Sequence, residues 1–351
     1  MAYTNIDDPS AYFQIKTGVG ASSPQSHTFD GNSDLQPDWL WWKRRDASGN
    51  HTLHDSTRGG NKFLYSNATT NEQTDGNLIS SFDTDGWSTK SSWFDLGSQT
   101  WVAWAWKANG GTTSSNTDGT LTGGATVQAN TDAGFSIITY TGTSQTNPTV
   151  GHGLNQAPEL VIVKNRDLAR NWAVGSTDVG WTKYLELDTT DAAATGSSHW
   201  GNQDPTSTTV GLGTITNTAG NTYDYVMYAF HSVQGFSKFG SYVGNGNTNG
   251  SFIYTGFKPA WVMVKQSNTA RNWQIFDNKR DGYNVDYMPR LKADTSDAET
   301  ASSGASMDFV SNGFKLRTDQ TGANQSGGTY LYMAFAENPF TTSTGIPTTA
   351  R

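Results

Sequence analysis

The chain has no cysteine, few charged residues and no long apolar run. Without cysteine, disulfide bonds and thiolate chemistry are excluded. Charged residues make up 15% of the 351, and the net charge of −8 gives no electrostatic reason to bind nucleic acid. No apolar stretch approaches the roughly 18 residues that a membrane-spanning helix requires. The first residues lack a basic segment followed by an apolar one, so we expect no signal peptide.

Glycine and aromatic residues, in contrast, are abundant. The chain contains 38 glycines and 13 tryptophans, and aromatic residues make up 12% of the sequence. No window of about a dozen residues shows the apolar period of a helix. Few charges, many turn-forming residues and many aromatic residues are typical of short strands joined by turns. We therefore expect an all-β protein.

One pattern occurs three times along the chain. A proline, an apolar run and a lysine follow one another, and an asparagine lies seven residues beyond each lysine. A second apolar run that contains an alanine closes each copy. The equal order and near-equal spacing indicate three copies of a unit of about one hundred residues. The repeated residues are Lys43, Lys164 and Lys265, with Asn50, Asn171 and Asn272.

Each copy contains roughly six or seven short strand patterns, at turn intervals typical of a sandwich or jelly roll. We predict three tandem, related β-sandwich domains of jelly-roll type, with a mobile or extended connection between the first two. The predicted segments are an N-terminal arm (1–8), a first copy (9–108), a Gly/Thr/Ser/Asn-rich linker (109–132), a second copy (133–233), a third copy (234–340) and a polar C-terminal tail (341–351).

Metal binding has two weak candidates. His51 and His54 form the best metal-like pair, but residues three apart on a strand point to opposite faces. Asp83 and Asp85 offer oxygen atoms to calcium without the spaced ligands of an EF-hand loop. An Asp-Gly pair is first of all a turn signal. We therefore favour local hydrogen bonds and turns, and predict neither a metal site nor a cofactor.

The many tryptophans suggest sugar binding, because an indole face can stack on the apolar face of a pyranose. Most of them lie in apolar strands, where a core position is the stronger interpretation. The sugar-binding candidates are the aromatic residues of predicted loops: Trp87, Trp93, Trp181, Trp200, Tyr283 and Tyr287. The alternative is that these residues cover the edges of the core or fill a subunit interface.

The repeated lysines and asparagines favour a structural role, which is more economical than three active sites. We expect each lysine to end a strand and to pair with a neighbouring carboxylate. We expect each asparagine to occupy a turn and to bond its own backbone. The sequence also lacks a nucleophile elbow, a zinc-protease motif and a phosphate loop. We therefore predict that the chain is not an enzyme.

Five segments carry a resemblance to a known group of proteins: Ile6–Gln14, Trp104–Gly110, Phe230–Gly240, Tyr254–Val262 and Ala334–Phe340. Together they resemble virion proteins of marine tailed bacteriophages, the phages that infect cyanobacteria and related ocean bacteria. The resemblance covers nearly the whole chain. It implies a structural protein of tail-fibre or spike type that is assembled in the host cytoplasm and resides in the virion. It implies no catalytic residue.

The expected function is thus a non-enzymatic fibre, spike or outer particle component that joins other virion proteins, binds the host surface, or does both. A homo-oligomer is expected, with a trimer favoured by analogy with symmetric phage appendages. Two alternatives remain open at this point. One is a carbohydrate-binding adhesin at a fibre tip that recognises host glycan. The other is a glycan depolymerase, which would need two carboxylates facing each other across a groove.

Overall fold

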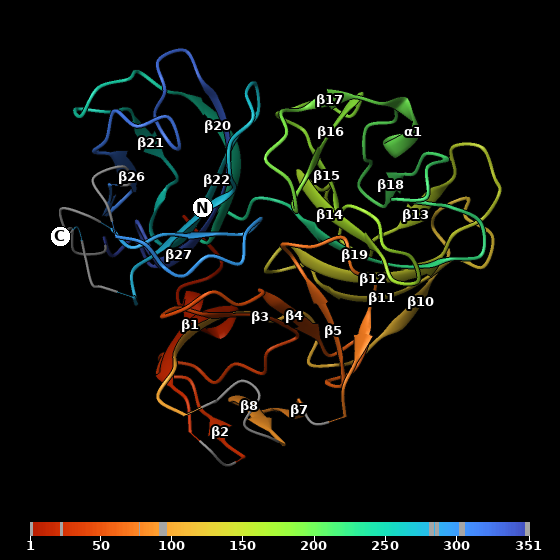
Figure 1. The fold of residues 1–351 in the computed structure, drawn as a ribbon, viewed down its shortest axis with the longest axis horizontal. Helices are drawn as coiled ribbons and strands as arrows, with labels where there is room; N and C mark the ends of the chain where they lie inside the picture. The colour runs from red at the N-terminus through yellow and green to blue at the C-terminus, as the bar shows by residue number, and fades with distance from the viewer. Residues whose placement is uncertain are drawn as a thin grey trace.

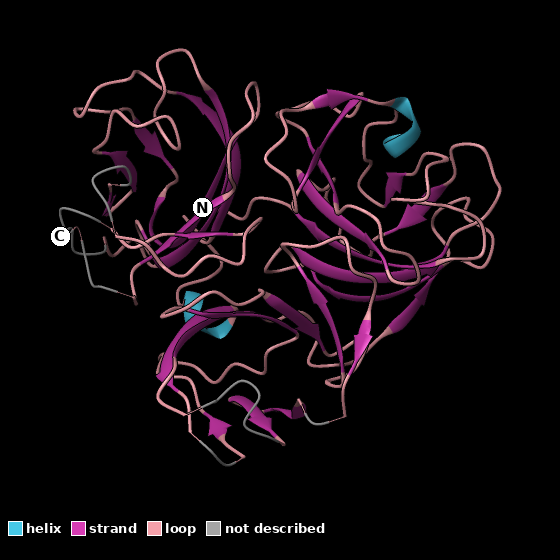
Figure 2. Cartoon of the chain, viewed as in Figure 1, coloured by secondary structure: helices cyan, strands magenta, loops and turns pink. Residues whose placement is uncertain are grey.

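The computed structural model describes residues 3–21, 24–76, 78–90, 97–280, 284, 288–301 and 306–347. Nearly all regular structure in these residues is β-strand, which confirms the all-β prediction (Figure 2). The exceptions are the 3-10 turn η1 (Pro9–Ala11) and the four-residue helix α1 (Ser197–Trp200). Neither helical segment of this described part has the length or apolarity of a membrane-spanning helix.

Each sequence copy builds one main antiparallel sheet, and the two repeated apolar runs become adjacent strands near its middle. In the first copy the order is β1 (Phe13–Val19), β9 (Thr100–Trp106), β3 (Trp39–Arg44), β4 (Thr52–Asp55), β5 (Lys62–Tyr65) and β6 (Gln73–Thr74).

The main sheet of the second copy is the longest. Its order is β10 (Ser114–Asn116), β11 (Ala125–Asn130), β12 (Phe135–Thr141), β19 (Asp224–Phe230), β14 (Leu160–Asn165), β15 (Ala173–Ser176), β16 (Lys183–Glu186) and β17 (Ala194–Thr195). The third copy has the order β20 (Ser237–Val243), β27 (Thr329–Pro339), β22 (Phe257–Gln266), β23 (Gln274–Asp277) and β24 (Leu291–Lys292).

A smaller sheet forms the outer layer of each copy (Figure 1). The outer sheets are β2 (Ser26–His27), β8 (Gly86–Thr89) and β7 (Ile79–Asp83) in the first copy, β13 (Thr149–Gly151) and β18 (Thr209–Gly211) in the second, and β21 (Phe252–Tyr254), β26 (Gly313–Leu316) and β25 (Met307–Val310) in the third. Each copy is therefore a two-layer sandwich, as the strand spacing predicted.

The other face of each main sheet points to the centre of the molecule, where the three copies meet (Figure 1). Because side chains alternate along a strand, β3 sends Trp39 and Trp41 into this centre and Leu40 and Trp42 into the outer core of its own copy. The apolar runs of the sequence are continuous because both faces of these strands are covered.

Aromatic rings join every pair of copies at the centre. Trp39 of the first copy stacks on Tyr228 of the second with ring centroids 4.4 Å apart. Phe230 of the second copy lies 5.6 Å from Phe239 of the third. Phe13 of the first copy stacks on Phe335 of the third, 5.1 Å away. The copies thus share one central core, which differs from the expected string of separate sandwich domains.

The segment 109–132, expected as a flexible linker, is part of the second copy. It contains β10 and β11, and β11 pairs with β12 from Thr126 to Asn130. Its strand signal is short: Val127 is buried while Thr126 is exposed. Glycine, serine and threonine on either side obscure that alternation, so the composition of the segment resembles that of a linker.

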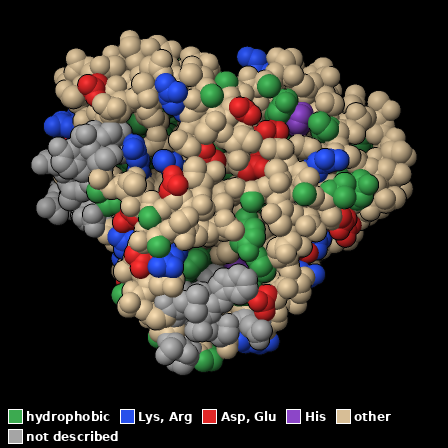
Figure 3. All heavy atoms as spheres, in the orientation of Figure 1, with side chains coloured by type: hydrophobic (Ala, Val, Ile, Leu, Met, Phe, Trp, Pro, Cys, Tyr) green, Lys and Arg blue, Asp and Glu red, His purple; other side chains and the backbone are tan. Residues whose placement is uncertain are grey.

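The N-terminal arm and the C-terminal tail lie against the third copy. The Tyr3 hydroxyl donates to the Gly256 carbonyl at 2.7 Å. The Ser343 amide donates to the Asp7 carboxylate at 2.6 Å, so the arm and the tail contact each other. On the face shown in Figure 3, acidic and basic side chains are interspersed.

The shared core predicts cooperative unfolding. Trp39→Ala removes a fully buried ring that contacts two copies, so we expect the free energy of unfolding to fall by about 3–5 kcal/mol. Val19→Ala, at a residue that is 61% exposed, should change it little. Calorimetry of the wild-type chain should give one transition. Three separate transitions, or a Trp39→Ala effect confined to the first copy, would contradict a shared core.

Candidate functional site

The predicted sugar-binding aromatics that the structure describes are core residues. Trp87, Trp181 and Trp200 are each exposed by 4% or less. Trp87 packs on His27 in the outer core of the first copy, and Trp181 meets Trp200 edge to face in the outer core of the second. Their prediction as sugar platforms is wrong, because all three rings are packed inside these cores. The other three candidates, Trp93, Tyr283 and Tyr287, lie outside the described residues.

The two histidines of the metal-like pair point to opposite sides of the first main sheet. The His51 Nδ1 atom accepts a hydrogen bond from Trp41 Nε1 at 2.8 Å in the central core. His54 stacks on Phe63, with ring centroids 5.8 Å apart, on the outer side. Burial lowers the pKa of His54 to about 3, so this side chain is neutral. No cluster of three or more metal-ligating side chains occurs in the described ranges.

Asp83 and Asp85 lie at the hairpin between β7 and β8. The Asp83 carboxylate accepts hydrogen bonds from the hydroxyls of Ser81 and Ser88, both at 2.6 Å. Asp85 accepts from the Leu35 amide at 3.2 Å. Both carboxylates serve the local turn, in agreement with the Asp-Gly turn signal.

The repeated lysines connect the copies in a ring. All three are fully buried, and each Nζ atom donates to a backbone carbonyl of the preceding copy in the ring. These bonds are Lys43 to Ser296 at 3.4 Å, Lys164 to Thr69 at 2.9 Å and Lys265 to Thr190 at 2.8 Å. Each lysine also donates to a carbonyl of its own copy, at Arg44, Arg170 or Arg271. The expected carboxylate partners are replaced by carbonyls.

The bonds of the lysines run from the first copy to the third, from the third to the second and from the second to the first. A chain of three units linked in this way is closed, so the copies are arranged with pseudo-threefold symmetry. Separate tandem domains would not produce such a cycle.

The repeated asparagines bond side chains, where bonds to their own backbone were expected. The Asn50 Oδ1 atom accepts from Asn67 at 2.8 Å, and Asn272 donates to Asp294 at 2.7 Å. Asn171 bonds the counterpart of these partners, Asp188. Each asparagine therefore connects the beginning of the strand that follows it with another loop of the same copy.

The residue after each asparagine also reaches the neighbouring copy, a role that the sequence analysis missed. The indole N–H of Trp172 donates to the Tyr65 carbonyl, and that of Trp273 to the Glu186 carbonyl, both at 2.8 Å. The shared Asn-Trp pair of the second and third copies was the available signal. The first copy has His51 at this position.

A buried ionic network lies between the first and second copies. Arg58 donates to Asp55 at 2.6 Å and to Glu72 at 2.9 Å, and all three side chains are almost fully buried. Arg166 and Tyr228 of the second copy complete the network by donating to Glu72 and Asp55. Burial tends to raise the pKa of Glu72, but the two arginines outweigh it and leave this pKa below its ordinary value.

The contact between the third and first copies repeats this network. Arg280 donates to Asp277 at 2.7 Å and to Glu299 at 2.9 Å. Arg45 of the first copy donates to Glu299 at 2.9 Å, and Trp104 donates to Asp277 at 2.9 Å. Sheet register makes Asp277 the counterpart of Asp55, since each lies opposite the first tryptophan of its proline run.

Among the residues that the structure describes, the contact between the second and third copies has no such network. The same register and the same backbone hydrogen bonds identify the residues that correspond to the network of the first and second copies. These residues are small or apolar: Ser176, Val179, Ala193, Ser267 and Met333. Two of the three equivalent contacts are therefore ionic at these positions, and the third has no charged residue at them.

This difference predicts how the ionic contact responds to mutation. Arg58→Met leaves Asp55 and Glu72 buried without their shared cation, so we expect the free energy of unfolding to fall by about 3–5 kcal/mol. The replacement of all five residues by their counterparts (Asp55→Ser, Arg58→Val, Glu72→Ala, Arg166→Ser, Tyr228→Met) also removes the buried carboxylates. We expect this variant to recover most of the loss in urea unfolding. Lower stability than Arg58→Met alone would contradict the equivalence of the contacts.

The lysines predict a pH dependence of stability. Burial lowers the pKa of Lys43, Lys164 and Lys265 to about 8, from an ordinary 10.5. Above pH 8 the unfolded chain therefore binds more protons at these sites than the folded chain, so their contribution to the free energy of unfolding rises with pH. Urea unfolding from pH 8 to about 9.5 should show a smaller rise for Lys164→Met than for the wild type. The exposed control Lys183→Met should keep the wild-type slope, and an unchanged slope in Lys164→Met would contradict the lowered pKa.

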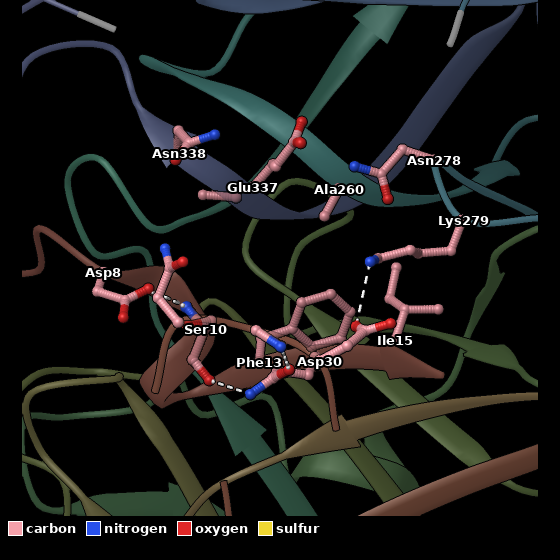
Figure 4. Close-up of a pocket in the computed structure, with 14 residues that line it drawn as sticks. Asp8, Ser10, Phe13, Ile15, Asp30, Ala260, Asn278, Lys279, Glu337 and Asn338 are labelled. Carbon is pink, nitrogen blue, oxygen red and sulfur yellow. Dashed lines mark hydrogen bonds and ion pairs between the residues drawn. The ribbon is translucent and has the colours of Figure 1, made fainter. Parts of the chain in front are cut away.

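A cavity of about 190 Å³ lies between the first and third copies, and it is the main candidate for a binding site (Figure 4). Its apolar lining comes from Phe13 and Ile15 of β1 and from Ala260 and Ala336 of the third copy. Its polar lining comes from Asp8, Ser10, Gln14, Asp30, Asn278, Lys279, Glu337 and Asn338.

The carboxylates around this cavity already have partners. Asp30 pairs with Lys279 at 3.2 Å, and Glu337 pairs with Lys258 at 2.9 Å. Asp8 accepts hydrogen bonds from the Ser10 amide and hydroxyl. The arrangement suits a small polar group more than acid–base chemistry. No sequence motif marks the cavity, because segments more than 200 residues apart form it.

Comparison with known proteins places the chain in one family. The model of a family described as "Domain of unknown function (DUF7483)" matches residues 8–339. No curated protein and no solved structure gives a significant match. Because the match spans almost the whole chain, the protein belongs to the DUF7483 family.

Proposed function

We propose that the chain is a non-enzymatic structural component of a bacteriophage particle, in a fibre, a spike or an outer layer of the virion. The closed ring of three copies is the observation that carries this proposal. Lys43, Lys164 and Lys265, which the sequence repeats most strictly, all bond a neighbouring copy. The repeated chemistry is thus used to hold the body together.

A body of this kind is suited to a load-resisting role. One aromatic core joins all three copies, and every copy bonds both of the others. Domain motion of the kind expected for weakly packed tandem domains would break buried bonds. The absence of cysteine allows assembly in a reducing cytoplasm and leaves the covalent structure unchanged outside the cell.

The placement of the aromatic residues favours assembly with other virion proteins over glycan binding. Trp87, Trp181 and Trp200 are taken up by the cores, so they offer no platform to a sugar. The adhesin alternative thereby loses these three of its anchors. A homotrimer was expected by analogy with symmetric phage appendages. Threefold symmetry is also present within one chain, so a single chain can occupy a symmetric position in a particle.

Purified phage particles test this proposal. We expect mass spectrometry to find the chain at a fixed ratio to the major capsid protein, and electron cryomicroscopy to show its three-lobed outline on the particle. Incubation of the purified chain with host polysaccharide should release no reducing ends. A chain that is abundant in infected cells but missing from washed particles would contradict a virion role.

A further inference from the structure

Each main sheet has one strand that pairs with the second apolar run and lies against the preceding copy in the ring. These strands are β1, β12 and β20, which occupy the same place in their sheets. A strand at an edge presents unpaired N–H and C=O groups on one side, and a folded protein has to cover or satisfy them. The three copies deal with this edge in three different ways.

In the second copy, β11 covers the edge of β12 and sends Gln128 into the contact with the first copy. Gln128 is fully buried. Its Oε1 atom accepts from the amides of Gly111 at 2.8 Å and Asn109 at 3.2 Å. Its Nε2 atom donates to the hydroxyls of Ser56 at 3.0 Å and Thr57 at 2.8 Å. Strand pairing and one carboxamide together fill this place.

In the third copy, the short connection that precedes β20 covers the edge. Ser237 donates its amide proton to the Val233 carbonyl at 2.9 Å, and Val233 donates to the Ser237 carbonyl at 3.2 Å. The Phe239 amide donates to the Ser232 hydroxyl at 3.1 Å. The outward backbone groups of Ser237 and the outward amide of Phe239 therefore have partners within the chain.

In the first copy, the edge of β1 has no such cover. The Lys107 amide donates to the Tyr12 carbonyl and the Gly20 amide to the Gln99 carbonyl, so even-numbered residues bond β9. Antiparallel pairing then directs the N–H groups of Phe13, Ile15 and Thr17 outward. Within the ranges that the structure describes, these three groups donate no hydrogen bond.

The cavity beside β1 corresponds to the space that Gln128 fills in the second copy. Phe13 lies opposite Trp106 as Phe135 lies opposite Phe230, so β1 and β12 are in equivalent register. Asn278 and Lys279 follow Asp277 as Ser56 and Thr57, the hydroxyl partners of Gln128, follow Asp55. Equivalent positions enclose the Gln128 carboxamide at the contact between the first and second copies. At the contact between the first and third copies they enclose open space (Figure 4).

We propose that the β1 edge and this cavity accept an extended segment of a different protein, which pairs antiparallel to β1 and places a glutamine side chain in the cavity. Strand addition to an exposed sheet edge is a general mode of peptide recognition, with main-chain bonds for affinity and a pocket for specificity. The strand β11 shows which occupant fits, because it makes this arrangement on β12. In another molecule of this chain, the β11 segment is already paired within its own sheet. The occupant is therefore a different protein.

The entrance to the cavity is compatible with strand entry. The Asp30–Lys279 ion pair is part of the cavity lining, and the two side chains are 55% and 47% exposed. An exposed ion pair contributes little to stability, so its opening costs little. The strand-accepting edge goes beyond the structural role proposed above and does not depend on it.

A peptide with the sequence of residues 124–131, which contains β11, is the probe for this proposal. We expect it to bind the full chain saturably, and we expect replacement of its glutamine by leucine to weaken binding at least about tenfold. Peptide binding should slow hydrogen exchange of the Ile15 and Thr17 amides, which face outward.

Two substitutions in the chain separate the edge from the cavity. Thr17→Pro removes an outward N–H that no described residue of the folded chain accepts, so it should abolish binding and leave the melting temperature unchanged. Thr17→Ala is its matched control and should bind like the wild type. Ala260→Leu fills the cavity from β22 and should weaken binding at least about tenfold.

Three results would overturn the proposal. The first is no saturable binding to folded wild-type chain, and the second is binding that survives both Thr17→Pro and Ala260→Leu. The third is self-association of the chain that Thr17→Pro abolishes, because the occupant would then be another molecule of the same chain. Failure of this proposal would leave the virion role untouched, since that role is tested on particles.

Discussion

The structure depends on three buried ammonium groups that find acceptors in another copy. A lysine removed from water is costly unless its donors are bonded. Lys43, Lys164 and Lys265 meet this requirement with one carbonyl from their own copy and one from a neighbour. A single copy would expose its inner aromatic face and lose half of these acceptors. Ring closure and the shared core follow from the same requirement.

The backbone keeps the threefold arrangement more strictly than the side chains do. Two contacts between copies contain an Asp-Arg-Glu network, and the third replaces it with small and apolar residues. One edge strand is covered by a paired strand, one by a short connection, and β1 by neither. Departures from equivalence are thus the places where the copies acquire individual roles, and the cavity beside β1 is the clearest of them.

The sequence predicted the parts of the fold that local pattern determines. The apolar runs became central strands, and Asp85-Gly86 became a hairpin turn, because each depends on neighbouring residues. The partner of Lys164 lies 95 residues away in another copy, so only the arrangement of copies reveals it. Trp200 was expected in a loop because its helix, α1, has only four residues and is too short to show a helical pattern. The cavity combines distant segments and has no local signature.

The central claim is that no copy folds without the other two. The most direct measurement is an NMR spectrum of the second copy alone, residues 109–233, which contains a complete main sheet and outer sheet. Without its neighbours, this fragment would expose Tyr228 and Phe230 and leave Lys164 without the Thr69 carbonyl. The account predicts poorly dispersed amide signals typical of an unfolded or aggregating chain. A well-dispersed spectrum of a folded monomer would contradict it.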